Sequence, residues 1–126
     1  MTRKDRLKVM IAGIGGASLG TEIFKCLALA GHYDIFGCDI SPTAYGLYDS
    51  SFSRTFLIDR ENYIAAVMSA CQEAGARWLI PGGEQPMVLL GAATNQLRQA
   101  GITLVANHPD VIRTFSNKSS TFECLA

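Results

Sequence analysis

The dipeptide Ala-Gly ends three apolar periodic segments of the chain, and this repeated ending restricts the possible folds more than any other sequence feature. It stands at 30–31, 74–75 and 100–101, and each time an apolar, strand-like run follows within a few residues. Glycine is common just after a helix because it adopts the left-handed backbone conformation without steric cost. Helices that alternate with strands in this way predict a parallel sheet covered by helices.

Five short apolar runs are the predicted strands. The first ends in glycine and fits a strand buried on both faces, as strands within a parallel sheet are. We therefore predict an α/β fold, a three-layer Rossmann-like parallel sheet of about five strands with helices on both faces. The predicted strands are residues 8–13, 33–40, 55–58, 77–81 and 102–106.

The first helix is predicted over residues 19–30, where Leu19, Ile23 and Leu27 recur with helical spacing. The connection between the second and third strands, residues 41–54, has turn residues and only weak periodicity. We expect a loop or a single distorted turn there.

Two further helices are predicted in the second half of the chain. One is capped by Asp59 and stops at Gly75. The next has Pro86 in its first turn and is closed by Gly101, and a short helix starts at Pro109. The inward-facing residues expected of the two longer helices are Ile64, Val67, Met68 and Cys71 in one, and Met87, Leu90, Thr94 and Leu97 in the other.

The composition restricts the class of partner. The chain has 126 residues, with 11 Lys and Arg against 11 Asp and Glu. This length suits one globular domain, and the balanced charge predicts no nucleic-acid partner. No run approaches the ~18 apolar residues of a membrane-spanning helix, so we expect no membrane partner. The four cysteines stand far apart without a CxxC pair, which is typical of reduced thiols in a cytoplasmic protein.

Ligands bind parallel α/β sheets beyond the carboxyl ends of the strands. In the first loop at this edge, Gly15 and Gly16 allow the backbone to approach a ligand closely. Against the dinucleotide-binding pattern GxGxxG, Ser18 replaces the third glycine, so the loop is either a ligand cradle or only a tight turn. The loops predicted at this edge are 13–18, 39–46, 81–86 and 106–109.

Two carboxylates stand in these loops. Asp39 ends the second strand, where it would hold a ribose hydroxyl or another ligand, or would only form a turn with Ser41 and Pro42. Glu84 either faces the ligand or stabilises a helix start through the helix dipole. Only His108 of the two histidines lies at this edge, and the sequence contains no evident nucleophile with an adjacent base and no metal-ligand cluster.

Four stretches, in this order, carry a resemblance to a known family: KVMIAGIGGASLG, FGCDISPTAYGLYDSSFSRTFLI, WLIPGGEQPM and GITLVANHPDVIRTFSNKSSTFECL. The chain resembles the N-terminal domain that precedes the ATP-grasp fold in carbamoyl-phosphate-synthase-like proteins and related carboxylate–amine ligases. The tail is the most specific part, since the family opens its next helix with Asp-Lys-x-x-(Thr/Ser). Here residues 117–121 read Asn-Lys-Ser-Ser-Thr.

The resemblance implies a function for several residues. Lys118 would contact the nucleotide, whereas Gly15, Gly16, Asp39 and Glu84 would line the pocket for the carboxylate or amine substrate. ATP and Mg²⁺ would serve the complete protein, which would phosphorylate a carboxylate to an acylphosphate that an amine then attacks.

The resemblance also implies a domain division. Residues 1–115 would form the Rossmann-like domain, and 116–126 would begin a following ATP-grasp domain that is cut short. We therefore expect this chain alone to be inactive, with no tightly bound cofactor. Its principal partner would be the downstream ATP-grasp domain of the same chain, and apolar surface left by that domain could pair two copies as a homodimer.

Two other functions remain open at this point. The glycine loop and Asp39 also suit an NAD(P)-binding Rossmann domain of an oxidoreductase. A non-catalytic module that binds a small ligand, with flavodoxin-like topology, is the second alternative. The long 41–54 connection, without a clear helix or clustered acidic residues, disfavours that module.

Overall fold

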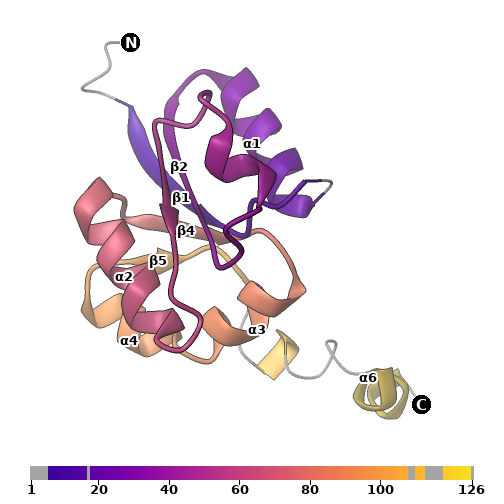
Figure 1. Cartoon of the computed structure of the whole chain (residues 1–126). Helices are drawn as coiled ribbons and strands as arrows, with labels where there is room; N and C mark the ends of the chain where they lie inside the picture. Colours follow the sequence, from indigo (N-terminus) through magenta and orange to yellow (C-terminus); the bar gives the residue numbers. More distant parts are fainter. Residues whose placement is uncertain (1–5, 17, 108–109, 113–117, 126) are drawn as a thin grey trace.

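A five-stranded parallel sheet forms the centre of the molecule. The computed structural model describes residues 6–16, 18–107, 110–112 and 118–125. The strand order is β3-β2-β1-β4-β5, and every neighbouring pair is parallel, which confirms the predicted fold class (Figure 1). The strands are β1 (Leu7–Ala12), β2 (Tyr33–Asp39), β3 (Arg54–Leu57), β4 (Trp78–Pro81) and β5 (Thr103–Leu104).

Helices cover both faces of this sheet. α1 and the short helix η2 pack on one face, where Ile11, Ile14, Ile35 and Phe52 are buried. α2, α3 and α4 pack on the other face, around a larger core that includes Met10. The helices are α1 (Leu19–Ala30), η2 (Tyr45–Tyr48), α2 (Tyr63–Ala74), α3 (Glu84–Gly91), α4 (Thr94–Gln99) and α6 (Lys118–Leu125).

The three Ala-Gly dipeptides end helices as predicted. Gly31, Gly75 and Gly101 have φ angles of 73°, 73° and 81°, in the left-handed region. The backbone N–H of Gly31 donates to the carbonyl of Leu27, and that of Gly75 donates to the carbonyl of Gln72, which closes each helix. The 41–54 connection contains only η2, in agreement with a loop or single distorted turn.

The helix predicted between Pro86 and Gly101 is instead two helices. α3 ends at Gly91 and α4 begins at Thr94. The Thr94 hydroxyl donates to the Gly91 carbonyl at 2.7 Å and so occupies an acceptor that a continuous helix would use. Of the four inward-facing residues predicted here, Leu90 and Leu97 are buried, whereas Met87 and Thr94 are partly buried.

Asp59 is not the cap of α2, and this prediction is wrong. The N-cap residue is Asn62. The Asp59 carboxylate accepts the backbone N–H of Glu61 at 3.0 Å and the Asn62 amide at 3.2 Å. Asp59 therefore forms a turn that precedes the helix, because its carboxylate binds the N–H of Glu61 and the Asn62 side chain and not a backbone N–H of the first helical turn.

Among the described residues, no helix has both the length and the apolar character needed to cross a bilayer. The four cysteines are free thiols, with Cys38 and Cys71 buried and Cys26 and Cys124 exposed.

Candidate functional site

The first glycine loop is closely packed against the β4–α3 loop. Gly13 has a φ of 104°, and its N–H donates to the Cys38 carbonyl at 2.8 Å. The N–H of Gly20 donates to the Gly82 carbonyl at 2.9 Å. A Cβ atom at Gly20 would overlap the carbonyl oxygen of Gly13 and would lie 3.3 Å from Gly82 Cα. Three glycines therefore allow two loops and a helix to meet without side chains between them.

In the GxGxxG pattern the third glycine allows close packing of the helix against the strand. Here Gly20, two residues beyond Ser18, has that function. Sequence reasoning missed it because the fixed spacing pointed to position 18. Ser18 is the N-cap of α1 instead: its hydroxyl accepts the N–H of Thr21, and the Thr21 hydroxyl oxygen accepts the N–H of Ser18, both at 3.3 Å. This reciprocal capping box satisfies helix donors within the chain.

Asp39 ties two loops together at the end of β2. One carboxylate oxygen accepts the N–H of Ile14 at 2.8 Å, and the other accepts the N–H of Ser41 at 2.9 Å. The Ser41 bond is the turn considered from the sequence, whereas the bond to Ile14 spans distant residues and could not be read from local pattern. Direct ligand binding by Asp39 stays a prediction.

A pocket of about 280 Å³ opens at this edge of the sheet. Gly13, Gly15, Gly82 and Gly83 contribute backbone to its lining. The side chains that line it fall into an apolar group and a polar group. The apolar group is Cys38, Ile40, Ile58, Pro86 and Leu89, and the polar group is Ser18, Asp39, Arg60, Tyr63 and Gln85.

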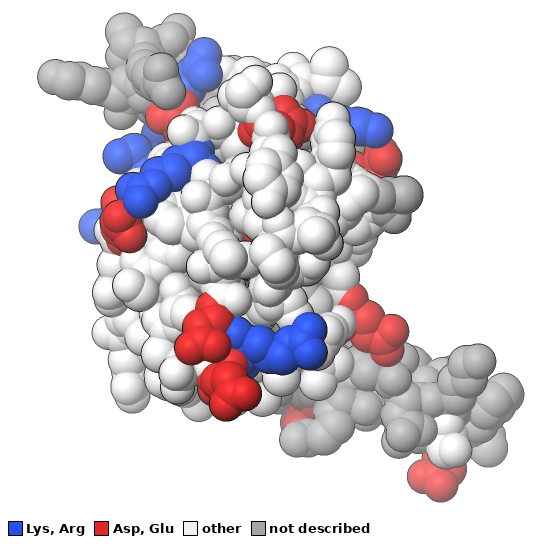
Figure 2. Space-filling view, viewed as in Figure 1, with Lys and Arg blue, Asp and Glu red and all other residues white. Residues whose placement is uncertain are grey.

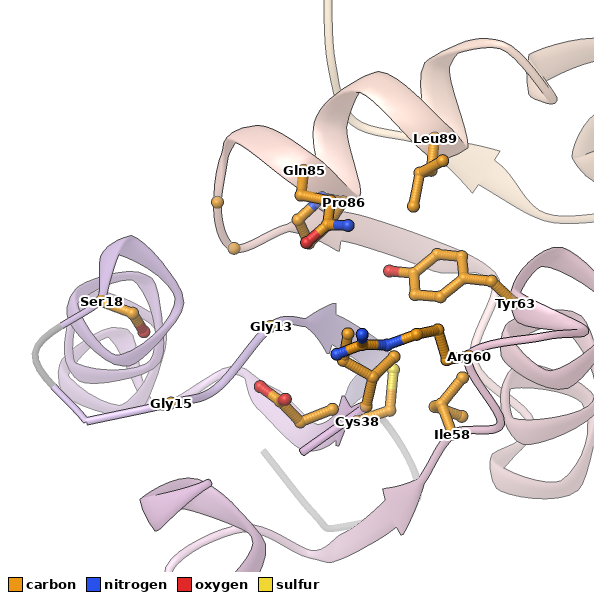
Figure 3. A pocket seen from close by; sticks show the side chains of 14 residues that line it. Gly13, Gly15, Ser18, Cys38, Ile58, Arg60, Tyr63, Gln85, Pro86 and Leu89 are labelled. Carbon is orange, nitrogen blue, oxygen red and sulfur yellow. The ribbon is translucent and has the colours of Figure 1, made fainter. Parts of the chain in front are cut away.

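Three polar side chains that the sequence analysis did not single out point into this pocket: Arg60, Tyr63 and Gln85 (Figure 3). Arg60 makes no ion pair with any residue in the described part of the chain. Its position two residues beyond the predicted strand 55–58 was the available signal, because that strand ends at the same edge of the sheet.

One tyrosine hydroxyl and two cysteine thiols in this region have pKa values raised by burial. Burial, and then the nearby Cys38 and Asp39, raise the pKa of the Tyr63 hydroxyl, so it remains a hydrogen-bond donor at neutral pH. Burial likewise raises the pKa of the Cys38 thiol, and that of Cys71 to about 12. These two cysteines are therefore packing residues and not thiolate nucleophiles.

The structure does not place all the predicted site residues together. Gly15 and Asp39 line the pocket, whereas Gly16 is exposed and does not. Glu84 lines a neighbouring pocket with Leu19 and others, and Gly83 borders both pockets. Their predicted contacts with substrate remain predictions.

Lys118 is the first residue of α6, and the position of its side chain lies outside what the structure describes, as does His108. Within the described residues, no three His, Cys, Asp or Glu side chains gather as metal ligands. Lys, Arg, Asp and Glu are scattered around one face of the molecule, and neither sign of charge forms a continuous patch there (Figure 2).

Comparison with known proteins gives structural similarity only. No protein-family model matches the chain, and no curated protein does. The biotin carboxylase subunit of pyruvate carboxylase superimposes with a TM-score of 0.69 at 18% identity, over 92% of this chain and 26% of that one. Glycinamide-RNase-transformylase T from Mycobacterium tuberculosis superimposes with a TM-score of 0.66 at 13% identity, over 92% and 33%. The matched part is the N-terminal region of ATP-grasp enzymes.

The chain has the fold of a pre-ATP-grasp domain. It spans about a quarter to a third of the length of the enzymes it matches. The pre-ATP-grasp fold agrees with the resemblance found in the sequence. RSP in complex with β-NADH is also similar, with a TM-score of 0.51 at 19% identity, over 96% of this chain and 64% of that one.

Proposed function

We propose that this chain is the substrate-side N-terminal domain of an ATP-dependent carboxylate–amine or similar ligase, carbamoyl-phosphate-synthase-like. The observation that carries the proposal is the superposition of nearly the whole chain on the N-terminal region of ATP-grasp enzymes. The pocket at the carboxyl edge supports it, because a substrate bound there faces the loops that follow β1, β2 and β4.

The proposed reaction has two steps. A carboxylate oxygen of the substrate attacks the γ-phosphorus of ATP and ADP leaves; the amine nitrogen then attacks the acyl carbon, loses a proton, and phosphate leaves with that oxygen. The residues of this chain would hold the carboxylate substrate and exclude water from it. We assign Lys118 to the nucleotide site of the complete protein, and we place the Mg²⁺ ligands outside the described residues.

Oxygen transfer tests this mechanism. The protein encoded by the full reading frame is incubated with ATP, an amine and a panel of carboxylic acids labelled with ¹⁸O in the carboxylate. One ¹⁸O in the released phosphate, detected by mass spectrometry, is the expected result. Unlabelled phosphate throughout, or ATP consumption independent of any acid, would contradict the acylphosphate route.

A dehydrogenase domain that binds NAD(P) is the second candidate. The glycine turn at Gly13 and the similarity to RSP in complex with β-NADH favour it. Against it, each Asp39 carboxylate oxygen already accepts a backbone N–H, from Ile14 or Ser41, where a dinucleotide domain offers its acid to a ribose. Titration of the chain with NADH, followed by fluorescence, distinguishes the two: we expect little binding, and saturable tight binding would favour the dehydrogenase.

The remaining assignments concern partners and location. We propose that the complete protein acts in the cytoplasm and that residues 1–115 dock on an ATP-grasp domain of the same chain that begins at 116. In the isolated chain, the surface that would contact that domain is exposed, and two copies would form a homodimer through it. Analytical ultracentrifugation of the chain, with and without downstream residues, tests this: self-association should disappear in the longer protein.

A further inference from the structure

The pocket beside Asp39 contains one cationic side chain among the residues that the structure describes. Arg60 lines it, and its guanidinium points into the space between the β1–α1 loop and α3 (Figure 3). No carboxylate among the described residues lies within ion-pair distance of Arg60. Arg60 is exposed, and its guanidinium presents a planar fork of donors that suits a carboxylate or phosphate.

The charge of the pocket lining favours a single negative charge on the ligand. Arg60 and Asp39 are the two charged side chains among the described residues that line it. Asp39 cannot turn away from the site, because both of its oxygens accept backbone N–H groups from Ile14 and Ser41. A phosphate dianion would have one of its two charges balanced by Arg60 and would be repelled by Asp39, whereas the single charge of a carboxylate is balanced by Arg60 alone.

The other lining residues favour an apolar body on that ligand. Ile40, Ile58 and Leu89 present aliphatic side chains, and Pro86 adds a ring. The Tyr63 hydroxyl and the Gln85 amide also point into the space, so neutral donors are available beside the guanidinium (Figure 3). Small-ligand sites commonly combine an apolar wall with a few polar groups that fix orientation.

We propose that this pocket binds a small monocarboxylic acid with an apolar body, and that Arg60 anchors its carboxylate. The inference rests on the proposed function in one respect, since this acid would be the carboxylate substrate of the ligase. It names a substrate class and an anchoring residue that fold similarity does not provide.

Binding to the 126-residue chain tests the proposal. The ¹⁵N-labelled chain is titrated with 4-methylpentanoate, its neutral amide and inorganic phosphate, and shifts of backbone amides are followed by NMR. We expect saturable binding of the acid, with shifts in the loops around Gly15 and Gly83, and much weaker binding of the amide and of phosphate.

Variants of Arg60 test whether this residue binds the carboxylate of the acid. Arg60→Gln should weaken binding of the acid about tenfold or more, because a charged hydrogen bond is lost. Arg60→Lys should restore part of the affinity, since it keeps the charge but not the planar fork. Arg98→Gln is the matched control, because Arg98 is exposed on α4 and does not line the pocket, and it should leave affinity unchanged.

Three outcomes would overturn the proposal: no binding of the acid, equal binding of acid and amide, or undiminished binding by Arg60→Gln. Tighter binding of phosphate than of the acid would replace the proposed ligand by a phosphorylated one. Failure of the pocket proposal is distinguishable from failure of the ligase proposal. If Arg60→Gln transfers ¹⁸O with an unchanged KM for the acid, Arg60 does not anchor the carboxylate but the ligase proposal stands. If the acid binds in an Arg60-dependent way but no ¹⁸O is transferred, only the ligase proposal is contradicted.

Discussion

The two glycine-rich junctions of this molecule have similar sequences and different uses. In the β1–α1 junction, Ile14 donates to Asp39, and α1 begins with a capping box formed by Ser18. In the β4–α3 junction, Gly83 is the N-cap and makes no side-chain cap hydrogen bond. Gln85, on the same short stretch, points into the pocket instead (Figure 3).

The difference shows that glycine content alone does not identify a ligand cradle. The β1–α1 junction uses its glycines and many of its polar groups to hold two loops and a helix together. In the β4–α3 junction Gly82 takes part in this packing, whereas the side chain of Gln85 beyond it is available to a ligand. If this comparison is right, substitutions in the first junction should affect stability more than substitutions beyond Gly83 in the second. Four substitutions with decreasing expected losses of unfolding free energy test this difference.

Gly20→Ala should cause the largest loss. The added Cβ would overlap the Gly13 carbonyl, and Gly82 Cα stands 3.3 Å away, so backbone must move. We expect a loss of more than about 3 kcal/mol in unfolding free energy, or failure to fold, although alanine has the better helix propensity. Urea denaturation followed by circular dichroism measures it. Gly16→Ala, with no atom within 4 Å of the new Cβ, is the control and should change little.

Asp39→Asn should have the next largest effect. The amide group of Asn replaces one acceptor by a donor and leaves the N–H of either Ile14 or Ser41 unsatisfied. We expect a loss of about 1–3 kcal/mol in unfolding free energy. Asp49→Asn is the matched control, because Asp49 accepts one backbone N–H, from Ser51, and an amide oxygen can replace it. Equal losses in the two variants would contradict the two-loop role of Asp39.

Ser18→Ala should cost less, because it removes one half of a capping box. The N–H of Thr21 would lose its acceptor. We expect about 1 kcal/mol of destabilisation in thermal or urea unfolding. Ser69→Ala, at an exposed position inside α2, should be neutral or slightly stabilising. If Ser18→Ala matched that control, the capping bond would contribute nothing measurable.

Glu84→Gln should have the smallest effect on folding. Glu84 is exposed in the first turn of α3, where the helix dipole is the one interaction we assign to its charge. The expected loss is about 0.3–1 kcal/mol at low ionic strength, and it should shrink at high salt. A larger loss that salt does not reduce would mean that the β4–α3 junction is held together as tightly as the β1–α1 junction.

Much of the fold was predictable because the signals are local. A glycine after a helix needs a left-handed backbone, and Gly31, Gly75 and Gly101 all adopt it. Apolar runs between such glycines predicted five parallel strands, and β5 is shorter than the predicted 102–106. The position of the pocket follows from the same alternation, because parallel strands end at a common edge.

The content of the pocket was less predictable. Gly15 and Asp39 were expected at a ligand site and line the pocket. Arg60 and Tyr63 were missed because the loop after the predicted strand 55–58 was not among the loops expected at this edge, although Arg60 lies in it and Tyr63 directly follows it as the first residue of α2. Glu84, the first residue of α3, lines a different pocket. Side-chain direction at a loop depends on how the loop is packed, and neighbours in the sequence do not determine that.

The sequence by itself determined the alternation of strands and helices, the helix ends and the edge at which loops meet, because these depend on backbone preference and apolar periodicity. Only the folded structure shows that Gly20 allows helix and loop to touch, that Asp39 binds the N–H of Ile14, and that Arg60 lines the pocket. Each of these depends on atoms brought together from distant segments, and the distance between such atoms is a property of the folded chain.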